Sequence, residues 1–394
     1  MCSSIAPDFL VLFFYLSQSK DKMSFKKIFL TVFIAYLLLF PVYLLSIYLY
    51  DPSHIFRNPG NLFAKSMRLQ ARAYLNENTN VSGIIIGSSM LENTSSVEAS
   101  KKLFPDTDNL FLNLSLEGSS FAERKLVLNY AFASHDIKKV MYSIDLAPLH
   151  FASKTNDDWQ KLYDSNPFND FLIYLRKEPL QCLLTLSKSK NCIGSKVGLD
   201  RPTAWIIDPK YANSFNGLCS WPITSKILLK DSLYNYQKTD AIKKTDAINS
   251  YNLAYQIKYT EDNVFSLTDK HNKTEFYFVV PPYSALYYKI KLSAAKNEYD
   301  WTRNFLKYFV SECDKRSNCH LYGFDDQAFI SDLKNYKDPM HYSDKINSLM
   351  IDSIANQENE INANNLNDYL EKSESIVENF DIEKVKKELS SCVD

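Results

Sequence analysis

Glycine is scarce in this chain, and neither sign of charge is in excess. The 394 residues include only 8 glycines, and 45 basic residues are matched by 46 acidic ones for a formal net charge of -1. Proteins that bind nucleic acid usually present a strongly basic face, so the charge balance argues against such a partner. With so few glycines, one that lies in a tight turn is expected to have a backbone role there.

Cysteine is present, but no C-x-x-C pair occurs, so a zinc site is not expected and no cofactor or other metal is predicted. In an exported domain, Cys182 with Cys192 and Cys313 with Cys319 would be spaced to close short disulfide loops. Free thiols fit the same spacing equally well. The remaining cysteines are Cys2, Cys219 and Cys392.

One long uncharged segment, residues 28–50, reads IFLTVFIAYLLLFPVYLLSIYLY. As a helix it would extend roughly 35 Å, enough to cross a bilayer as a single transmembrane helix. A buried soluble helix and a cleaved signal peptide are the alternatives, although no small-residue cleavage site follows Tyr50. The lysines before the segment predict a cytoplasmic N-terminus, with the bulk of the chain outside the cytoplasmic membrane, in the periplasm. These are Lys20, Lys22, Lys26 and Lys27.

Short apolar runs separated by helix-like segments predict an α/β fold. Because the runs are continuously apolar, they indicate strands buried on both faces of a mostly parallel sheet. We therefore expect a three-layer α/β/α sandwich. The predicted strands cover residues 81–86, 110–114, 139–144, 276–280 and 320–324.

The domain boundaries follow from changes in this pattern. Residues 1–27 form a cytoplasmic tail, of which 1–22 is either a genuine tail or an upstream mis-start before Met23. Residues 51–75 form a linker, and residues 76–355 form the α/β domain. Within that domain, residues 151–270 lose the alternation and read as a largely helical insertion or cap. Residues 356–394 form an acidic tail with a peripheral helix or disorder.

The first candidate site residue is Ser89, in the segment IIIGSSM at 84–90. A serine directly after a buried strand lies at the carboxyl end of the sheet, where α/β sites form. A helix that starts there would present N–H groups and its positive end to a developing oxyanion. A plain turn is the alternative, because Ser and Gly are common turn formers.

The second candidate pair is Asp338 and His341, in the segment Asp-Pro-Met-His. A serine nucleophile needs a base, and the base needs an acid to orient it. Residues three apart on a loop before a helix can both face one site. A helix-capping or surface histidine is the alternative.

A third feature is the segment NLSLEG, which runs from Asn113 to Gly118 after the second predicted strand. Gly118 can present its N–H toward the same sheet edge, where it would form a two-donor oxyanion hole with the N–H of Ser89. A simple turn glycine is the alternative.

The order Ser89, Gly118, Asp338-x-x-His341 resembles the SGNH (GDSL-like) hydrolase and acyltransferase superfamily, over residues 81–144 and 276–354. With the membrane helix, the chain looks most like two envelope branches: the D-alanyl lipoteichoic acid transfer proteins and the alginate O-acetylation proteins. The resemblance implies that Ser89 is the nucleophile, His341 the base and Asp338 the acid. It also implies oxyanion donors at Ser89 and Gly118.

Two positions depart from the family pattern. Ser88 stands in place of the first-block Asp, and Asp145 stands in place of the third-block Asn that supplies another oxyanion donor. An ionised carboxylate would repel an oxyanion. Either Asp145 points elsewhere, Asn113 substitutes as the donor, or the activity is low or altered.

The sequence therefore favours a membrane-anchored serine esterase or O-acyltransferase that acts on an envelope glycan or polymer. A membrane-bound acyltransferase that delivers the acyl group would be a fitting partner. One alternative is a catalytically inactive SGNH-like scaffold in a surface-polysaccharide modification complex. Another is a surface binding protein with coincidental motifs, which predicts that Ser89 and His341 lie far apart.

Overall fold

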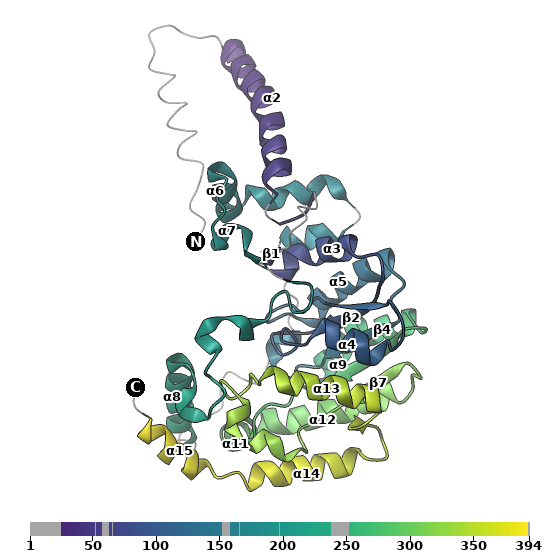
Figure 1. Cartoon of the computed structure of the whole chain (residues 1–394), viewed down its shortest axis with the longest axis vertical. Coiled ribbons are helices and arrows are strands. Elements are labelled where there is room, and N and C mark those ends of the chain that lie inside the picture. The colour runs from purple at the N-terminus through teal and green to yellow at the C-terminus, as the bar shows by residue number, and fades with distance from the viewer. Residues whose placement is uncertain are drawn as a thin grey trace.

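A computed structural model describes residues 25–51, 53–56, 63–64, 66–151, 158–164, 166–196, 198–237 and 252–392. Helix α2 (Phe25–Tyr50) projects from one end of the molecule, and helices α14 (Leu366–Glu378) and α15 (Ile382–Ser391) lie at the other (Figure 1). By length and composition α2 can cross a membrane. The predicted tail up to residue 24, with the alternative start at Met23, lies outside the described residues.

The fold is mixed α/β, built on a six-stranded sheet in the order β3-β2-β4-β6-β7-β8. All neighbouring strands are parallel except β7 and β8. The chain passes from β2 to β3 on one side and then to β4 on the other, so the strand order reverses at β2. The carboxyl end of β2 is therefore a topological switch point, where ligands bind in open α/β sheets. The strands are β2 (Val81–Ile86), β3 (Leu110–Asn113), β4 (Lys139–Ser143), β6 (Glu275–Val279), β7 (Cys319–Tyr322) and β8 (Glu360–Ile361).

Both faces of the sheet are covered, because successive strand residues join two different apolar clusters. Ile84 and Ile86 pack into one cluster, whereas Ile85 packs into the other. The first cluster includes side chains of α3 (Met67–Glu77), α5 (Phe121–Ser134) and α12 (Lys296–Cys313). The second includes side chains of α4 (Ser96–Leu103), α11 (Ala285–Ala294) and α13 (Asp344–Asn356).

The insertion after β4 consists mainly of short helices, and it ends earlier than the sequence predicts. Tyr259, Val264 and Phe265 are buried in the first core cluster, so residues 253–270 belong to the covering of the sheet. This segment comprises α9 (Leu253–Thr260), a π-helical turn (Glu261–Phe265) and α10 (Ser266–Lys270). Within the insertion lie η3 (Pro167–Leu175), α6 (Lys177–Thr185), α7 (Lys190–Ile193), η4 (Trp205–Ile207) and α8 (Ile223–Gln237). Its strand β5 (Ser195–Lys196) pairs with β1 (Phe63–Ala64), which precedes α3.

The C-terminal segment, for which the sequence predicts a peripheral helix or disorder, contains helices α14 and α15. β8 extends the sheet, and Leu366, Tyr369 and Leu370 of α14 are buried in the core. Tyr369 and Leu370 lie three and four positions after Leu366, so all three side chains are on one side of the helix. A disulfide between Cys219 and Cys392 joins the end of α15 to the insertion.

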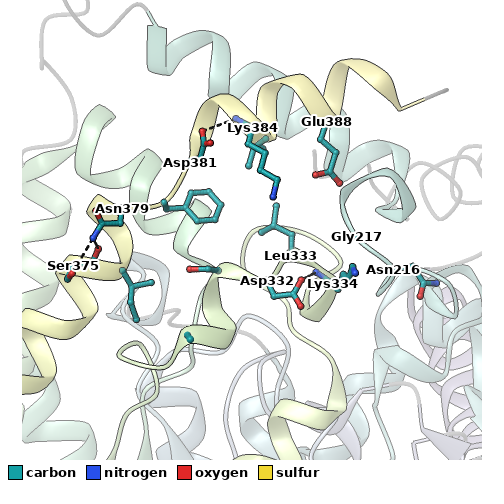
Figure 2. A pocket seen from close by; sticks show the side chains of 15 residues that line it. Asn216, Gly217, Asp332, Leu333, Lys334, Ser375, Asn379, Asp381, Lys384 and Glu388 are labelled. Atoms are coloured by element: carbon teal, nitrogen blue, oxygen red, sulfur yellow. Dashed lines mark hydrogen bonds between the residues drawn. The ribbon is translucent and has the colours of Figure 1, made fainter.

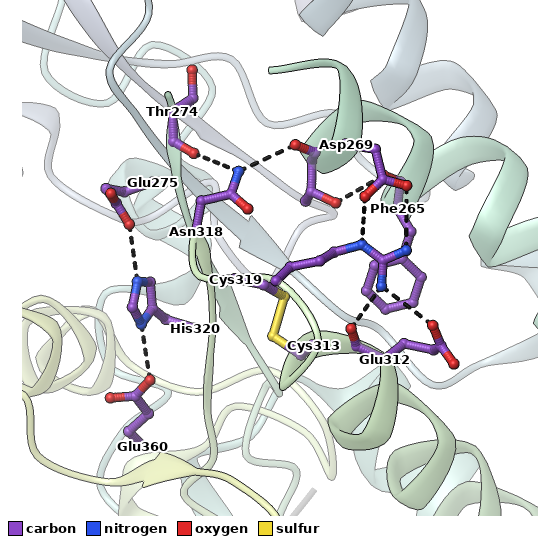
Figure 3. Close-up of a disulfide and its surroundings, with 12 residues drawn as sticks. Phe265, Asp269, Thr274, Glu275, Glu312, Cys313, Asn318, Cys319, His320 and Glu360 are labelled. Atoms are coloured by element: carbon purple, nitrogen blue, oxygen red, sulfur yellow. Dashed lines mark hydrogen bonds and ion pairs between the residues drawn. A yellow bond between two sulfur atoms is a disulfide. The ribbon is translucent and has the colours of Figure 1, made fainter. Parts of the chain in front are cut away.

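The described cysteines form three disulfides, including both pairs that the spacing allowed. Figure 3 shows the bond between Cys313 at the end of α12 and Cys319 at the start of β7. Beside it, His320 lies between carboxylates of β6 and β8, with ring nitrogens 2.9 Å from Glu275 and 2.9 Å from Glu360. These contacts tie the three strands together at this edge.

Candidate active site

Ser89, His341 and Asp338 lie in one continuous chain of contacts. The Oγ of Ser89 is 2.9 Å from Nε2 of His341, although 252 positions separate the two residues. On the other side of the ring, Nδ1 is 2.9 Å from Oδ2 and 3.0 Å from Oδ1 of Asp338. This is the arrangement of a nucleophile, a base and an orienting acid. The coincidental-motif alternative required a large separation, which is not observed.

The backbone places Ser89 differently from the expectation. Ser89 follows β2 at the switch point, but the next helix, α4, begins only at Ser96 and is capped by the Ser95 hydroxyl. Residues 88–94 instead form tight turns, with hydrogen bonds from Leu91 N to Ser88 O and from Thr94 N to Leu91 O. The prediction that a helix N-terminus faces the oxyanion is therefore wrong. Any stabilisation there must come from individual N–H groups of the turns.

Asp338 is held as an ionised acid by its surroundings. Its Oδ1 accepts the main-chain N–H groups of Met340 and His341, each at 2.9 Å, and its Oδ2 is 2.9 Å from Nζ of Lys337. Burial opposes ionisation, but the hydrogen bonds from His341 and the charge of Lys337 outweigh it and hold the pKa of Asp338 well below its usual range. A carboxylate in this state fixes the tautomer of His341, with Nδ1 carrying the proton and Nε2 free to accept one.

A buried charged cluster lies beneath the nucleophile turn. Asp145 is fully buried and accepts hydrogen bonds of 2.6 Å from the hydroxyls of Ser88 and Ser143. It also forms a salt bridge of 2.7 Å with Arg124, whose side chain is likewise fully buried. Asp145 therefore points into this cluster, and its charge is compensated there. Of the three explanations offered for Asp145 in place of Asn, the structure supports the one in which Asp145 points away from the oxyanion.

The titration of this cluster follows from its contacts. Burial by itself would raise the pKa of Asp145, but the Arg124 guanidinium overrides it and lowers the pKa to about 2. Burial and Arg124 lower the pKa of His150, although Asp145 acts in the opposite direction. Nδ1 of His150 lies 2.6 Å from the carbonyl oxygen of Ser119, so this nitrogen carries the proton that it donates. At neutral pH the cluster thus holds one cation, one anion and a neutral imidazole.

Asn113 occupies a supporting position rather than an oxyanion hole. Its carboxamide donates to the main-chain oxygens of Leu91 and Thr94, both at 2.8 Å, and its Oδ1 accepts from Ser115 N at 3.0 Å. With its N–H groups directed at the turn, Asn113 holds the segment that follows Ser89. The tentative assignment as an oxyanion donor therefore does not fit the observed geometry.

Gly118 lies in a tight turn next to the pocket that contains Ser89. Ser119 N donates to Leu116 O at 3.1 Å, and Gly118 adopts a φ of 56°. That left-handed conformation favours glycine. Leu116 and Glu117 line the Ser89 pocket, whereas Gly118 lines a neighbouring one.

Trp205 of the insertion completes the site, and no sequence motif predicts its role there. Its indole N–H donates a hydrogen bond of 2.8 Å to the main-chain oxygen of Ser89. Its ring meets the ring of His341 edge to face, with centroids 5.6 Å apart. The ammonium of Lys337 lies 4.6 Å from the Trp205 ring centroid and 4.5 Å from that of Tyr211. One aromatic wall thus contacts the nucleophile segment, the base and the lysine beside the acid.

The triad opens into a pocket of about 590 Å³ between the α/β domain and the insertion. Its lining includes both signs of charge, and the acidic side chains besides Glu92 are Glu117 and Asp208. Glu92 is only 6% exposed, and burial, with the charge of Glu117, raises the pKa of Glu92 to about 8, although Arg68 opposes this. Glu92 is therefore uncharged at neutral pH. The lining cations are Arg68, Lys190, Lys210 and Lys337.

A larger cavity of about 710 Å³ lies between α14, α15 and the segment 328–334 (Figure 2). Asp332, Lys334, Lys384 and Glu388 line it, and neither Ser89 nor His341 does. Nor do the described ranges contain three His, Cys, Asp or Glu side chains gathered as metal ligands. Among the described residues, the hydroxyl–imidazole–carboxylate chain is the arrangement with a clear chemical capability.

Comparisons with known proteins leave the family open. Neither a family model nor a curated protein matches the chain. A solved structure of a protein from Streptococcus pneumonia, provisionally named a platelet activating factor, is similar to it with a TM-score of 0.37 and 10% identity. That similarity covers 74% of this chain and 90% of the other. It is too low to carry a functional argument.

Proposed function

We propose that this protein is a membrane-anchored, extracytoplasmic serine esterase or O-acyltransferase with an SGNH-type three-layer α/β/α domain. The observation that carries the proposal is the contact of 2.9 Å between Ser89 Oγ and His341 Nε2, with Asp338 at 2.9 Å from Nδ1. An unactivated serine is a poor nucleophile, and this contact supplies the base that it needs.

The proposed reaction has two steps, acylation of Ser89 and deacylation. The Ser89 oxygen attacks the carbonyl carbon of an acyl ester as its proton passes to Nε2 of His341. The tetrahedral intermediate collapses, the ester C–O bond breaks, and the leaving oxygen takes that proton, leaving an acyl ester on Ser89. Water or an acceptor hydroxyl then gives a proton to His341 and attacks the acyl carbon. The acyl group departs as an acid or a new ester, and Ser89 regains its proton.

Asp338 and the turn residues support these steps through charge. The ionised Asp338 stabilises the imidazolium that forms on His341 in each step. The oxyanion would be held by the main-chain N–H groups of Ser89 and Gly118. The salt bridge of Asp145 with Arg124 neutralises the carboxylate that would otherwise repel that oxyanion. For this reason we favour an active enzyme over an inactive scaffold.

Contacts at the end of α2 support a permanent anchor rather than a cleaved signal peptide. Ile47 is 1% exposed and packs with Tyr174 and Leu183 of the insertion. The next residue after the helix, Asp51, accepts hydrogen bonds from the Tyr174 hydroxyl at 2.6 Å and from Ile55 N at 2.9 Å. Cleavage after the helix would remove one side of this packed cluster. The anchor would hold the domain on the outer side of the cytoplasmic membrane.

The substrate that we propose is an acylated envelope glycan or polymer, with a membrane-bound acyltransferase as the partner in the transfer mode. Trp205 and Tyr211 of the pocket lining offer ring faces for sugars, and the mixed charges of the lining offer polar groups for their hydroxyls. Both features are also compatible with simple ester hydrolysis.

Hydrolysis of a small ester such as p-nitrophenyl acetate by the detergent-solubilised full chain tests the proposal. Replacing Ser89 or His341 by alanine should lower kcat/KM roughly 10³-fold or more, because the activated nucleophile is lost. Ser134→Ala, at an exposed position on α5, is the matched control and should retain wild-type rates. Unchanged hydrolysis in Ser89→Ala would contradict the mechanism. An inactive wild type that supports polymer modification equally well with Ser89→Ala would establish the scaffold alternative.

A further inference from the structure

Two short helices beside α2 expose large apolar side chains to solvent. On η3, Phe168 is 84% exposed. On α6 and directly after it, Leu184 is 76% and Leu186 58% exposed. Side chains of this size are rarely left open in a group unless something covers them. We call η3, α6 and Leu186 the collar.

The collar contacts α2 well before the C-terminal end of that helix. Tyr174 of η3 and Leu183 of α6 bury Ile47, and the ring of Phe171 meets that of Phe40 with centroids 6.3 Å apart. Phe40 lies ten positions before Tyr50, or about 15 Å along the helix axis. Figure 1 accordingly places α6 beside the lower part of α2.

The depth of Phe40 in a bilayer can be bounded from the sequence. Lys26 and Lys27 at the start of α2 belong at the inner interface, so the hydrocarbon begins near Ile28. At 1.5 Å per residue, Phe40 then lies about 18 Å into a core about 30 Å thick. The contact with Phe171 would thus lie about 12 Å inside the outer boundary of the hydrocarbon. Any part of the domain at that depth must be surrounded by lipid.

We propose that the collar is embedded in the outer leaflet of the lipid bilayer and holds the mouth of the Ser89 pocket at the membrane surface. This inference rests on the membrane anchorage in the proposed function. Asp170 of η3 does not oppose it, because this carboxylate is buried and pairs with Arg72 at 2.7 Å. Lys177 and Glu178 at the start of α6 and Lys188, three positions after its end, would lie at the level of the headgroups.

The collar is covalently connected to the wall of the candidate active site. Cys182 of α6 is bonded to Cys192 of α7, and Lys190 of α7 lines the pocket with Ser89 and His341. An elongated substrate that enters past Lys190 would therefore arrive from the membrane side. The substrate class that fits is an amphiphile, such as an acyl ester on a lipid-linked glycan.

Fluorescence of the full chain in phosphatidylcholine and phosphatidylglycerol vesicles tests the embedding. An environment-sensitive dye would be attached through Phe168→Cys, Leu184→Cys or, as a matched control, Leu228→Cys on the distant helix α8, which is 67% exposed. Dyes at 168 and 184 should show blue-shifted emission and quenching by spin-labelled lipids, while the dye at 228 should report water. Water-like emission at 168 and 184 would overturn the proposal. The same holds if shielding arises only in native membranes, because a protein partner would then cover the collar.

Enzyme assays separate this inference from the proposed function. The double variant Phe168→Glu/Leu184→Glu should lose at least tenfold in rate on a vesicle-bound acyl ester yet keep the wild-type rate on soluble p-nitrophenyl acetate. Leu228→Glu should retain both rates. If the double variant and the wild type hydrolyse the vesicle-bound ester at equal rates, the collar has no role in substrate access. Failure of Ser89→Ala to affect the soluble ester would instead refute the proposed function and leave the fluorescence result standing.

Discussion

The hydroxyl of Ser88 donates a hydrogen bond of 2.6 Å to the carboxylate of Asp145, and both side chains are buried beneath the candidate nucleophile. These are the two positions at which the sequence departs from the SGNH pattern. The two positions are therefore in direct contact: Ser88, where the SGNH pattern has Asp, donates to Asp145, where the pattern has Asn. Arg124 completes the arrangement with its salt bridge to Asp145.

The substitution Asp145→Asn, which introduces the amide of the SGNH pattern, should therefore destabilise this protein. The substitution leaves the fully buried Arg124 guanidinium without its counter-charge, and breaking a buried pair from one side typically costs about 3–5 kcal/mol. Chemical denaturation of the domain would measure this loss. The control is Asp300→Asn, which breaks an exposed pair with Lys296 and should change stability by less than about 1 kcal/mol. A fully stable Asp145→Asn would show that the pair contributes little.

Alkaline inactivation should depend on Glu92. With its pKa raised to about 8 by burial, Glu92 is neutral at pH 7 and becomes an anion in the Ser89 pocket as the pH rises through about 8. An added negative charge there opposes oxyanion formation, so kcat/KM should fall with a midpoint near pH 8. In Glu92→Gln this fall should disappear, as a pH–rate profile on a neutral ester would show.

Stability gives Glu92 a second, independent readout. Because its folded-state pKa lies above the ordinary value of 4.5, the folded protein holds a proton that the unfolded chain releases between these values. The free energy of unfolding should therefore decrease as the pH rises from about 5 to 8, and Glu92→Gln should flatten this slope. Glu117→Gln, at an exposed position in the same pocket, removes only the smaller charge contribution to the pKa of Glu92 and should keep most of the slope. If the free energy of unfolding depends on pH in the same way in wild type and Glu92→Gln, Glu92 does not have a raised pKa in the folded protein.

Trp205→Phe should weaken catalysis while leaving the fold intact. Phenylalanine keeps a ring against His341 but removes the N–H that donates to the Ser89 carbonyl at 2.8 Å. A hydrogen bond contributes about 0.5–1.5 kcal/mol, so kcat/KM should fall about threefold to tenfold with an almost unchanged melting temperature. Tyr211→Phe, which keeps its ring in the same aromatic wall, should remain near the wild-type rate. Equal activity of the two variants would mean that the indole N–H does not position the nucleophile.

The parts of the fold that were predictable from sequence are those with local signals. Apolar runs located β2, β4 and β6, and the mostly parallel sheet followed from their continuous hydrophobicity. Ser89 and His341 were identified because each stands in a short motif next to a strand or a helix start. The parallel sheet then brings their segments together at the switch point.

The features that were missed depend on contacts across long stretches of sequence. Trp205 reaches Ser89 from 116 positions away, within an insertion whose short helices lack a clear period. The sequence predicts a helix directly after Ser89, but the segment forms turns whose carbonyl groups are held by side chains distant in sequence, such as Asn113. Cys392 at the end of the C-terminal helices is bonded to Cys219, 173 positions away, and no spacing in the sequence predicts this pair.

That disulfide should stabilise the protein more than the shorter ones do. The Cys219–Cys392 bond spans 173 positions, whereas Cys182–Cys192 spans 10. In the chain-entropy account, a closed loop restricts the unfolded state in proportion to the logarithm of its length, which gives about 5 kcal/mol for the long loop and about 3 kcal/mol for the short one. The double variant Cys219→Ala/Cys392→Ala should therefore lose more stability in thermal or chemical unfolding than Cys182→Ala/Cys192→Ala. It should also speed amide exchange in α15, whose Val385 and Leu389 pack into the second core cluster. Slow exchange in α15 after removal of the bond would mean that apolar packing alone holds this helix.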